Sequence, residues 1–451
     1  MSLSNLKVLV CGASIAGPTT AYWLARAGAS VTVIERFPQL RTAGHNVDIR
    51  HLGLKVMHQM KGMEEQVLKK KLDLRGISLV NPTNGGTFGV LGGNNDNKEK
   101  KNNNNDGQSL LSEYEIYRGD LSEIIVDLSI NLPNPKIPIN YVFGEEISSI
   151  TRTSTGHNGD CDGQVEVGFT NGQLPTETYD LVVDCGGSMS RTRGIGMGSN
   201  LSPKDHLNPV NSWTANFSIP KGPDDNTNTN IALAHSAPGG RVIFLDNTQK
   251  ERTKVVATKQ TTSSKELEDF RQSLKAGESQ LKRYVHDIFE GSGWRTEEIL
   301  RGMMNSRSND FYAGEWVQVK LPRLYSSKGN FVLVGDAGYA PGPTGAGTSL
   351  ALTGGYILAG ELMSAQKEGK GTRAGLEAYN DRMRPIIDDL QKLPPFIKTA
   401  MAPQTAWGIW IRNRMFSFIV RSRVLEVMGK YVAPAFESGE KYKLPQYEWK
   451  E

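Results

Sequence analysis

The N-terminal segment constrains the fold most strongly, because it places a glycine-rich turn between an apolar strand and a helix. Residues 6–12 predict the strand, and Gly12-Ala-Ser-Ile-Ala-Gly17 opens the helix. Residues 30–35 predict a second strand that ends in Glu35. Such a turn brings a helix N-terminus to a pyrophosphate, and the acid binds ribose hydroxyls. The segment therefore predicts a dinucleotide-binding α/β unit, with Ser14 in the place of the usual middle glycine.

A second motif, near the other end of the chain, suits the same kind of ligand. Residues 331–334 are apolar and predict a strand, Gly335-Asp336 follows, and residues 345–347 form a glycine-rich start of another helix. A carboxylate at the end of a strand can bind the ribityl hydroxyls of a flavin. The helix N-terminus favours the negative charge that a reduced flavin carries near N1 and O2. This motif therefore predicts a flavin site.

A third motif lies between these two and completes a recognisable order. Residues 179–184 predict a strand that enters a Gly186-Gly187 turn, and Ser-Arg-Thr-Arg193 follows. In this order the three motifs resemble the single-component FAD aromatic hydroxylases of the p-hydroxybenzoate hydroxylase fold, the group A flavoprotein monooxygenases. Within that group the chain is most similar to tetracycline-inactivating monooxygenases and to fungal secondary-metabolite monooxygenases. The resemblance extends from Leu6 to about Arg384.

The resemblance implies a set of residues around FAD. The family's stretch that corresponds to residues 41–53 lines the isoalloxazine ring, although the alternating residues Val47 to Arg50 are also typical of a short strand with a polar face. The family usually has Asp where this chain has Gly186, which affects how a nicotinamide nucleotide docks. The implied FAD-binding residues are Gly12, Ser14, Ile15, Ala16, Gly17, Glu35, Arg36, Val47, Asp48, Arg118, Gly187, Gly335, Asp336, Pro343, Gly345, Ala346 and Gly347.

The chemistry that the resemblance implies is carried by the cofactor. NADPH or NADH reduces FAD, O2 adds at the flavin C4a, and the hydroperoxide oxygenates an electron-rich, largely apolar small molecule of polyketide or alkaloid type. No catalytic acid or base can be named from the residues. A Baeyer–Villiger monooxygenase, an epoxidase or a flavin oxidase would share these motifs. The alternative from another class is a degenerate protein that binds flavin without turnover, which the intact Glu35 and Asp336 disfavour.

The positions of the motifs predict a discontinuous cofactor domain, because segments scattered along the chain must meet on one flavin. We expect an α/β fold in which a Rossmann-like FAD domain accompanies a mainly antiparallel substrate domain and a C-terminal helical segment. Helices are expected near residues 264–286 and 294–304. The expected ranges are 1–76, 115–204 and 320–385 for the FAD domain, 77–114 and 205–319 for the substrate domain, and 386–451 for the helical region.

Composition excludes several other classes of function. The net charge is only +4 over 451 residues, without a long basic run, so nucleic acid is not an expected partner. Three cysteines exclude a disulfide framework, and no His-x3-His or Cys-x2-Cys pair suggests a metal site. Because neither a targeting segment nor an apolar run of membrane-spanning length is evident, we expect a cytoplasmic enzyme.

Two further segments have their own character. Residues 92–107 are rich in asparagine and lack apolar side chains, so they predict a solvated hairpin insert between two strands. Residues 407–421 combine arginines with aromatic side chains. This second segment either contacts a membrane surface weakly or packs as a helix on the body of the protein.

Overall fold

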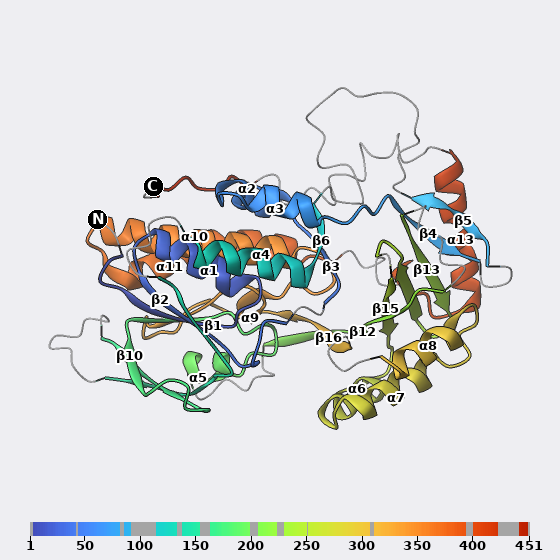
Figure 1. The fold of residues 1–451 in the computed structure, drawn as a ribbon, viewed down its shortest axis with the longest axis horizontal. Coiled ribbons are helices and arrows are strands. Elements are labelled where there is room, and N and C mark those ends of the chain that lie inside the picture. The colour runs from blue at the N-terminus through green and yellow to red at the C-terminus, as the bar shows by residue number, and fades with distance from the viewer. Residues whose placement is uncertain are drawn as a thin grey trace.

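The computed structural model shows two units joined by long strands (Figure 1). One unit contains the N-terminal strands and the helices that flank them. The other contains a larger, mainly antiparallel sheet with its own helices. The structure describes residues 3–41, 44–81, 85–91, 114–132, 138–153, 163–198, 206–222, 230–249, 251–306, 311–393, 400–422 and 442–449. The predicted α/β fold class is confirmed.

A parallel sheet organises the first unit. Its strands, in spatial order, are β17 (Phe331–Leu333), β11 (Leu181–Asp184), β1 (Lys7–Cys11), β2 (Ser30–Glu35) and β7 (Asn140–Phe143). The strands are short and rich in buried Val, Leu and Ile, as expected for a parallel sheet covered on both faces. The register aligns Leu333, Asp184, Cys11 and Ile34. The loops that follow these four strands therefore leave the sheet at one edge.

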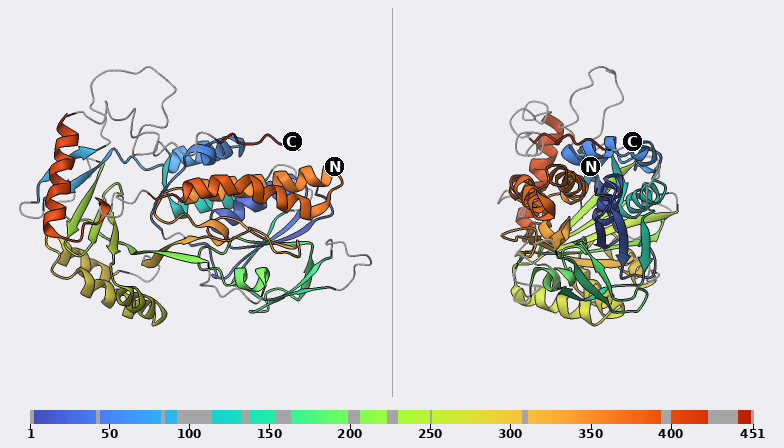
Figure 2. Two further views of the ribbon diagram at one scale, coloured as in Figure 1. Left: turned by 180° about the vertical axis from the view of Figure 1, so that it is seen from behind. Right: turned by 90° about the vertical axis from the view of Figure 1, so that its left-hand side faces the viewer.

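Two layers cover the faces of this sheet (Figures 1 and 2). One layer contains helices. Two of them, α1 and α10, approach closely because residue 355 is glycine: a Cβ there would lie 2.9 Å from the backbone nitrogen of Thr20. The helices of this side are α1 (Ala16–Arg26), α2 (His51–Gln59), α3 (Met63–Lys70), α4 (Arg118–Ile130), α10 (Gly347–Lys367) and α11 (Gly371–Leu390). The opposite layer contains β8 (Ile147–Arg152), β9 (Val165–Phe169), β10 (Glu177–Tyr179) and α5 (Thr192–Met197).

The second unit is built on a seven-stranded sheet whose strand pairs are antiparallel except for β13 with β4. Helices α6 (Ser264–Lys275), α7 (Glu278–Phe289) and α8 (Thr296–Met304) cover one face. The helical structure expected near 264–286 is confirmed, but Gly277, with φ +102°, divides it into α6 and α7. The strand order is β16 (Tyr312–Val319), β12 (Leu207–Pro220), β15 (Arg252–Gln260), β14 (Arg241–Asp246), β13 (Ile231–Ala237), β4 (Gly76–Val80) and β5 (Thr87–Leu91).

The Asn-rich segment 92–107 lies outside the described residues. The strands on either side of it are β5 and β6 (Glu115–Tyr117), and they belong to different sheets. Strand β5 pairs with β4, whereas β6 pairs with β3 (Asn46–Asp48). The expectation that these flanking strands form a hairpin is therefore wrong.

The C-terminal segments contact both units. Helix α13 (Ala406–Ser422) packs on β5 and β13 of the larger sheet (Figure 2). It leaves Trp407 and Phe418 exposed, at 72% and 65%. Farther on, the ring of Trp449 lies 4.6 Å from that of Trp23 in the parallel-sheet unit. Packing on the body is thus observed for α13, while a membrane-surface contact through its exposed side stays a prediction.

Among the helices that the structure describes, none has both the length and the apolar character needed to cross a membrane.

Candidate functional site

The loop after β1 forms a turn that only glycine permits. Gly12 has φ +104°, and a Cβ at this position would lie 2.7 Å from the carbonyl oxygen of Cys185. A Cβ at Gly17 would lie 1.8 Å from the carbonyl oxygen of Gly12. Ile15 is the N-cap of α1 and provides no side-chain cap. The backbone N–H groups of Ala16 and Gly17, the first two residues of α1, therefore remain available to an anionic group.

Glu35 fixes this turn from the end of β2. Its two carboxylate oxygens accept hydrogen bonds from the backbone N–H groups of Ala13, at 2.9 Å, and Phe37, at 3.1 Å. The carboxylate retains lone pairs that can also accept from ribose hydroxyls. Arg36 follows at the exposed rim, where its guanidinium lies 5.0 Å from the centre of the Phe37 ring.

Arg118, at the start of α4, joins the turn to the segment before β3. Its guanidinium donates to Ser14 Oγ at 2.9 Å, and its backbone N–H donates to the carbonyl oxygen of His45 at 3.0 Å. The hydroxyl of Ser14 thus has a defined role at the position where a glycine is usual. Burial and the positive charge of Arg118 lower the pKa of His45 to about 4, so this histidine is neutral at pH 7.

Asp336 lies between the N-termini of two long helices. Gly335, with φ +69°, precedes it, and a Cβ at Gly335 would lie 2.8 Å from the Cβ of Ala16 at the start of α1. A Cβ at Gly347, the first residue of α10, would lie 3.7 Å from Asp336 Oδ1. Asp336 begins the short helix α9 (Asp336–Tyr339). The loop that carries Pro343, Gly345 and Ala346 leads from α9 to α10.

The environment of Asp336 is that of an open groove. The residue is solvent-exposed, yet the protein around it desolvates the carboxylate and raises its pKa, while Arg118 opposes the rise. A side chain that is exposed to solvent and yet surrounded by protein is expected inside a concave surface, and we call this surface around Asp336 the groove. A ligand that fills this groove would complete the burial of the carboxylate and could donate hydrogen bonds to it.

Val47 and Asp48 lie in the short strand β3, as the strand interpretation predicts. Two hydrogen bonds fix the end of this segment to α10: the N–H of Arg50 donates to Ser349 Oγ at 3.1 Å, and that hydroxyl donates to the carbonyl oxygen of Arg50 at 2.9 Å. The Arg50 guanidinium donates to Asp48 Oδ2 at 3.0 Å. Strand β3 thus stands beside the N-terminus of α10, and its role toward a cofactor stays a prediction.

The Gly186-Gly187 turn shows why glycine replaces the usual acid. Asp184, two residues earlier and fully buried, accepts from the N–H of Gly186 at 2.8 Å and from Ser190 Oγ at 2.6 Å. A Cβ at Gly186 would lie 2.9 Å from Asp184 Oδ1. A carboxylate at position 184 therefore occupies the turn, and a side chain at 186 would collide with it. In the described part of the chain, no hydrogen bond joins Gly187 or Arg36 to the group around Arg118.

Sequence reasoning missed the residues that connect the groove to the larger sheet. Tyr117, in β6, donates to Asp246 Oδ2 at the end of β14, at 2.8 Å. Burial and the charge of Asp246 raise the pKa of Tyr117 far above its usual value, so the hydroxyl keeps its proton. Leu245 packs toward α6 to α8, so Asp246 belongs to the opposite face of the sheet. That opposite face therefore looks toward β6 and β3.

The face that looks toward β6 is polar along β12. Trp213, Ala215 and Phe217 pack toward the helices, so Thr214 and Asn216 point the other way. Asn216 is only 6% exposed, and among the residues that the structure describes neither its Oδ1 nor its Nδ2 has a hydrogen-bond partner. A buried amide without protein partners is costly, so a ligand or water that hydrogen-bonds to it would stabilise this face of the sheet. The alternation of Trp213, Ala215 and Phe217 with polar residues is the sequence signal that could have placed Asn216 on the second face of the sheet.

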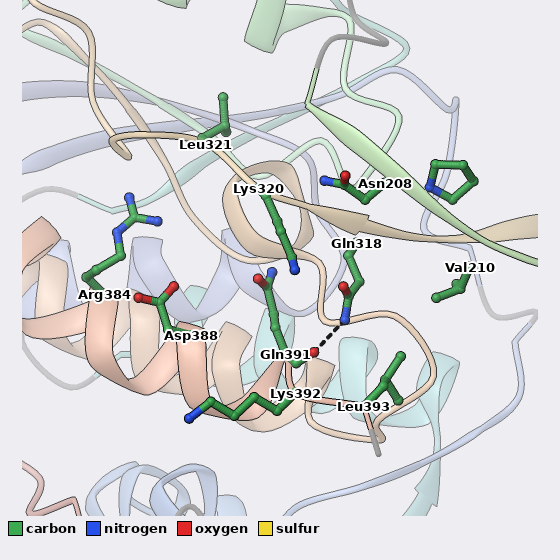
Figure 3. Close-up of a pocket in the computed structure, with 11 residues that line it drawn as sticks. Asn208, Val210, Gln318, Lys320, Leu321, Arg384, Asp388, Gln391, Lys392 and Leu393 are labelled. Carbon is green, nitrogen blue, oxygen red and sulfur yellow. Dashed lines mark hydrogen bonds between the residues drawn. The ribbon is translucent and has the colours of Figure 1, made fainter. Parts of the chain in front are cut away.

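A cavity of about 700 Å³ lies behind the loop between α9 and α10 (Figure 3). Gln318 Nε2 donates to the carbonyl oxygens of Pro341, at 3.1 Å, and Gln391, at 2.6 Å, which ties this loop to β16 and α11. None of the residues predicted to bind a cofactor lines this cavity. Its lining residues are Asn208, Pro209, Val210, Gln318, Lys320, Leu321, Arg384, Asp388, Gln391, Lys392 and Leu393.

Comparisons with known proteins agree with this geometry. No family model matches the chain. A flavin-dependent monooxygenase of Legionella longbeachae is 30% identical over 98% of this chain and 99% of its own length. The FAD-dependent monooxygenase asL4 of Sarocladium schorii is 28% identical over 99% of both chains. The crystal structure of tetracycline destructase Tet(51) has a TM-score of 0.71 at 26% identity and covers 98% of this chain and 99% of its own.

These similarities extend over almost the whole length of this chain and of its relatives. The chain therefore belongs to the FAD-dependent group A flavin monooxygenases.

Proposed function

We propose that this enzyme uses NADPH or NADH and O2 to oxygenate a largely apolar small molecule, of polyketide or alkaloid type, that contacts the polar face of the larger sheet. One observation carries the proposal. The groove around Asp336 and Arg118 lies on the side of β3 and β6, and the sheet face with the unpartnered Asn216 looks toward the same strands. A cofactor and a second ligand could therefore meet there.

Three features make the groove suitable for FAD. The start of α1 has free N–H groups, the turn requires glycine at 12 and 17, and Asp336 is partly desolvated. In the proposed complex, the turn holds the pyrophosphate and Glu35 the ribose of the nucleotide. Asp336 and the N-terminus of α10 hold the ribityl chain and the flavin ring. When bound there, FAD supplies the electron-transfer and oxygen-transfer chemistry. The surrounding residues orient the two ligands and exclude water.

We propose NADPH or NADH as the electron donor because the family to which the chain belongs consists of monooxygenases, in which an external reductant must balance the second oxygen atom. The sequence has one dinucleotide fingerprint, so the nicotinamide would approach through the space shared with the substrate. A flavin oxidase, reduced by its own organic substrate, remains the alternative. Asp184 supplies a buried carboxylate in the turn at Gly186, which weakens the argument for an oxidase from that glycine.

We further propose the discontinuous domain division given above, with 1–76, 115–204 and 320–385 as the cofactor domain, and a cytoplasmic location. Cys11 and Cys185 are free and buried, and burial raises the pKa of both thiols well above their usual value. Such thiols are unreactive and compatible with a reducing compartment.

Replacing Asn216 with leucine tests the proposed substrate surface. Because leucine has a similar volume and removes two unpartnered polar atoms, we expect the free energy of unfolding to rise by about 1–3 kcal/mol. The same change should reduce product formation and increase the H2O2 released per NADPH oxidised. Chemical denaturation and a peroxide assay measure the two effects.

Thr258→Val is the matched control, since Thr258 lies on the same face but donates to Thr214 Oγ1 at 3.4 Å. It should not stabilise the fold. A loss of stability in Asn216→Leu would show that the fold itself uses the amide, and the proposed contact would then be wrong.

A further inference from the structure

Two acidic residues face each other beside the groove. Asp48 in β3 and Glu115 in β6 are directly opposite partners of the antiparallel pair. Directly opposite residues have Cβ atoms about 4.5–5.5 Å apart and point to the same face. Each carboxylate has one engaged oxygen: Asp48 Oδ2 accepts from Arg50, and Glu115 Oε1 accepts from Asn46. The other two oxygens, Asp48 Oδ1 and Glu115 Oε2, are buried without a hydrogen-bond partner in the described part of the chain.

Two ionised carboxylates at this separation would repel each other in a poorly solvated place. Glu115 is 6% exposed, and burial, followed by the charge of Asp48, raises its pKa to about 7. Burial also raises the pKa of Asp48, while Arg50 opposes that rise. When two carboxyl groups share a site, one of them retains its proton to much higher pH than usual.

We propose that Asp48 and Glu115 share one proton, bound between Asp48 Oδ1 and Glu115 Oε2, and that FAD binds preferentially to this singly protonated pair. With one proton, the pair and Arg50 together carry no net charge. Without it, the same three groups carry one negative charge. The second half of the proposal rests on the cofactor role proposed above for Asp48; the first half does not.

The charged groups packed around the pair support this assignment. Strand β3 contributes the amide of Asn46, and Arg50 follows two residues after its end. Strand β14 contributes Asp246, whose charge raises the pKa of Glu115 further. Asp246 itself accepts hydrogen bonds from Tyr117 and from the N–H of Thr248. The uncharged Ser349 contacts Arg50 from α10.

Cofactor binding and this proton are thermodynamically linked. FAD brings a negatively charged pyrophosphate and would cover the groove from water, and both effects disfavour an additional negative charge nearby. FAD binding would therefore raise the pKa of the pair. By reciprocity, loss of the proton weakens FAD binding as the pH rises through that pKa.

The test compares FAD affinity at pH 6 and pH 9 in the wild type, Glu115→Gln and Glu123→Gln, by titrating apoprotein with FAD and following flavin fluorescence. We expect binding by the wild type to weaken about tenfold at pH 9, the change that one unit of pKa shift on binding produces. Glutamine imitates the protonated acid, since its NH2 can donate to Asp48 Oδ1, so Glu115→Gln should lose most of this pH dependence. Glu123, which pairs with Lys70 on the exposed side of α4, should behave as wild type when replaced.

Infrared spectroscopy of the apoprotein at pH 6 gives an independent measurement. The carbonyl-stretch band of a protonated carboxyl should appear in the wild-type minus Glu115→Gln difference spectrum and be absent from the wild-type minus Glu123→Gln difference. Asp184, whose pKa burial raises to about 6, contributes equally to all three proteins and cancels. If Glu115→Gln does not fold, Asp48→Asn should remove the pH dependence in its place. An unchanged pH dependence in the folded variant, or no carboxyl band in the wild-type minus Glu115→Gln difference, would refute the shared proton. Failure to bind FAD at any pH would instead refute the cofactor site while the infrared result stands.

Discussion

Asp336→Ala is expected to lower FAD affinity roughly 10- to 150-fold, because a hydrogen bond to a charged group contributes about 1.5–3 kcal/mol. The carboxylate stands between the starts of α1 and α10, where ribityl hydroxyls would donate to it. The fold should not suffer, since Asp336 is exposed in the groove and desolvation already raises its pKa. The ratio of flavin to protein absorbance after purification, and the dissociation constant of FAD, measure the effect.

Asp388→Ala is a matched control for this change. Asp388 is also an exposed acid near the end of α11, but it lines the cavity behind the loop and not the groove. Its replacement should leave FAD affinity unchanged. Equal FAD content in Asp336→Ala and wild type would show that the ribityl chain is held elsewhere.

Gly17→Ala is expected to have the second large effect, and on the fold as well as on the cofactor. The added Cβ would lie 1.8 Å from the carbonyl oxygen of Gly12, and that backbone is itself held against Cys185. Since neither backbone segment can move without opening the turn, we expect a loss of stability of several kcal/mol, comparable with the larger core substitutions, and loss of bound FAD. Thermal unfolding of the apoprotein and FAD titration measure the two losses.

Gly347→Ala distinguishes a loss of stability caused by a steric clash from a loss of FAD binding at the site. Here the nearest atom to the added Cβ is Asp336 Oδ1 at 3.7 Å, an ordinary contact, and alanine is a better helix former than glycine. The apoprotein should therefore be as stable as wild type. FAD should still bind less tightly, because the added methyl group stands where α10 begins. A stable Gly17→Ala protein with normal FAD content would contradict the assignment of the turn.

The local motifs were predictable because each depends on neighbouring residues. The steric need for glycine at 12 and 17, the acid at the end of β2, and the Gly335-Asp336 pair all follow from strand, turn and helix signals within short stretches. That these stretches meet was also predictable, because all of them must contact one flavin. The family assignment obtained from them is confirmed.

The contacts between distant segments were not predictable from a single sequence. Asp48 and Glu115 are far apart in the chain and become neighbours only through the pairing of β3 with β6, while Tyr117 meets Asp246 across the two units. The hairpin expected around the Asn-rich segment failed for the same reason, since strand partners are set by the fold and not by adjacency. Ser14 departs visibly from the usual glycine of the motif, but its structural role depends on its contact with Arg118.

The most direct test of the proposed function is anaerobic mixing of the purified, FAD-loaded enzyme with NADPH or NADH, with flavin absorbance followed by stopped flow. We expect one of the two coenzymes to bleach the flavin, slowly alone and at least tenfold faster with the true substrate, which corresponds to about 1.4 kcal/mol of barrier. A flavin that neither coenzyme reduces, but that an organic compound bleaches without them, would contradict the account and identify an oxidase.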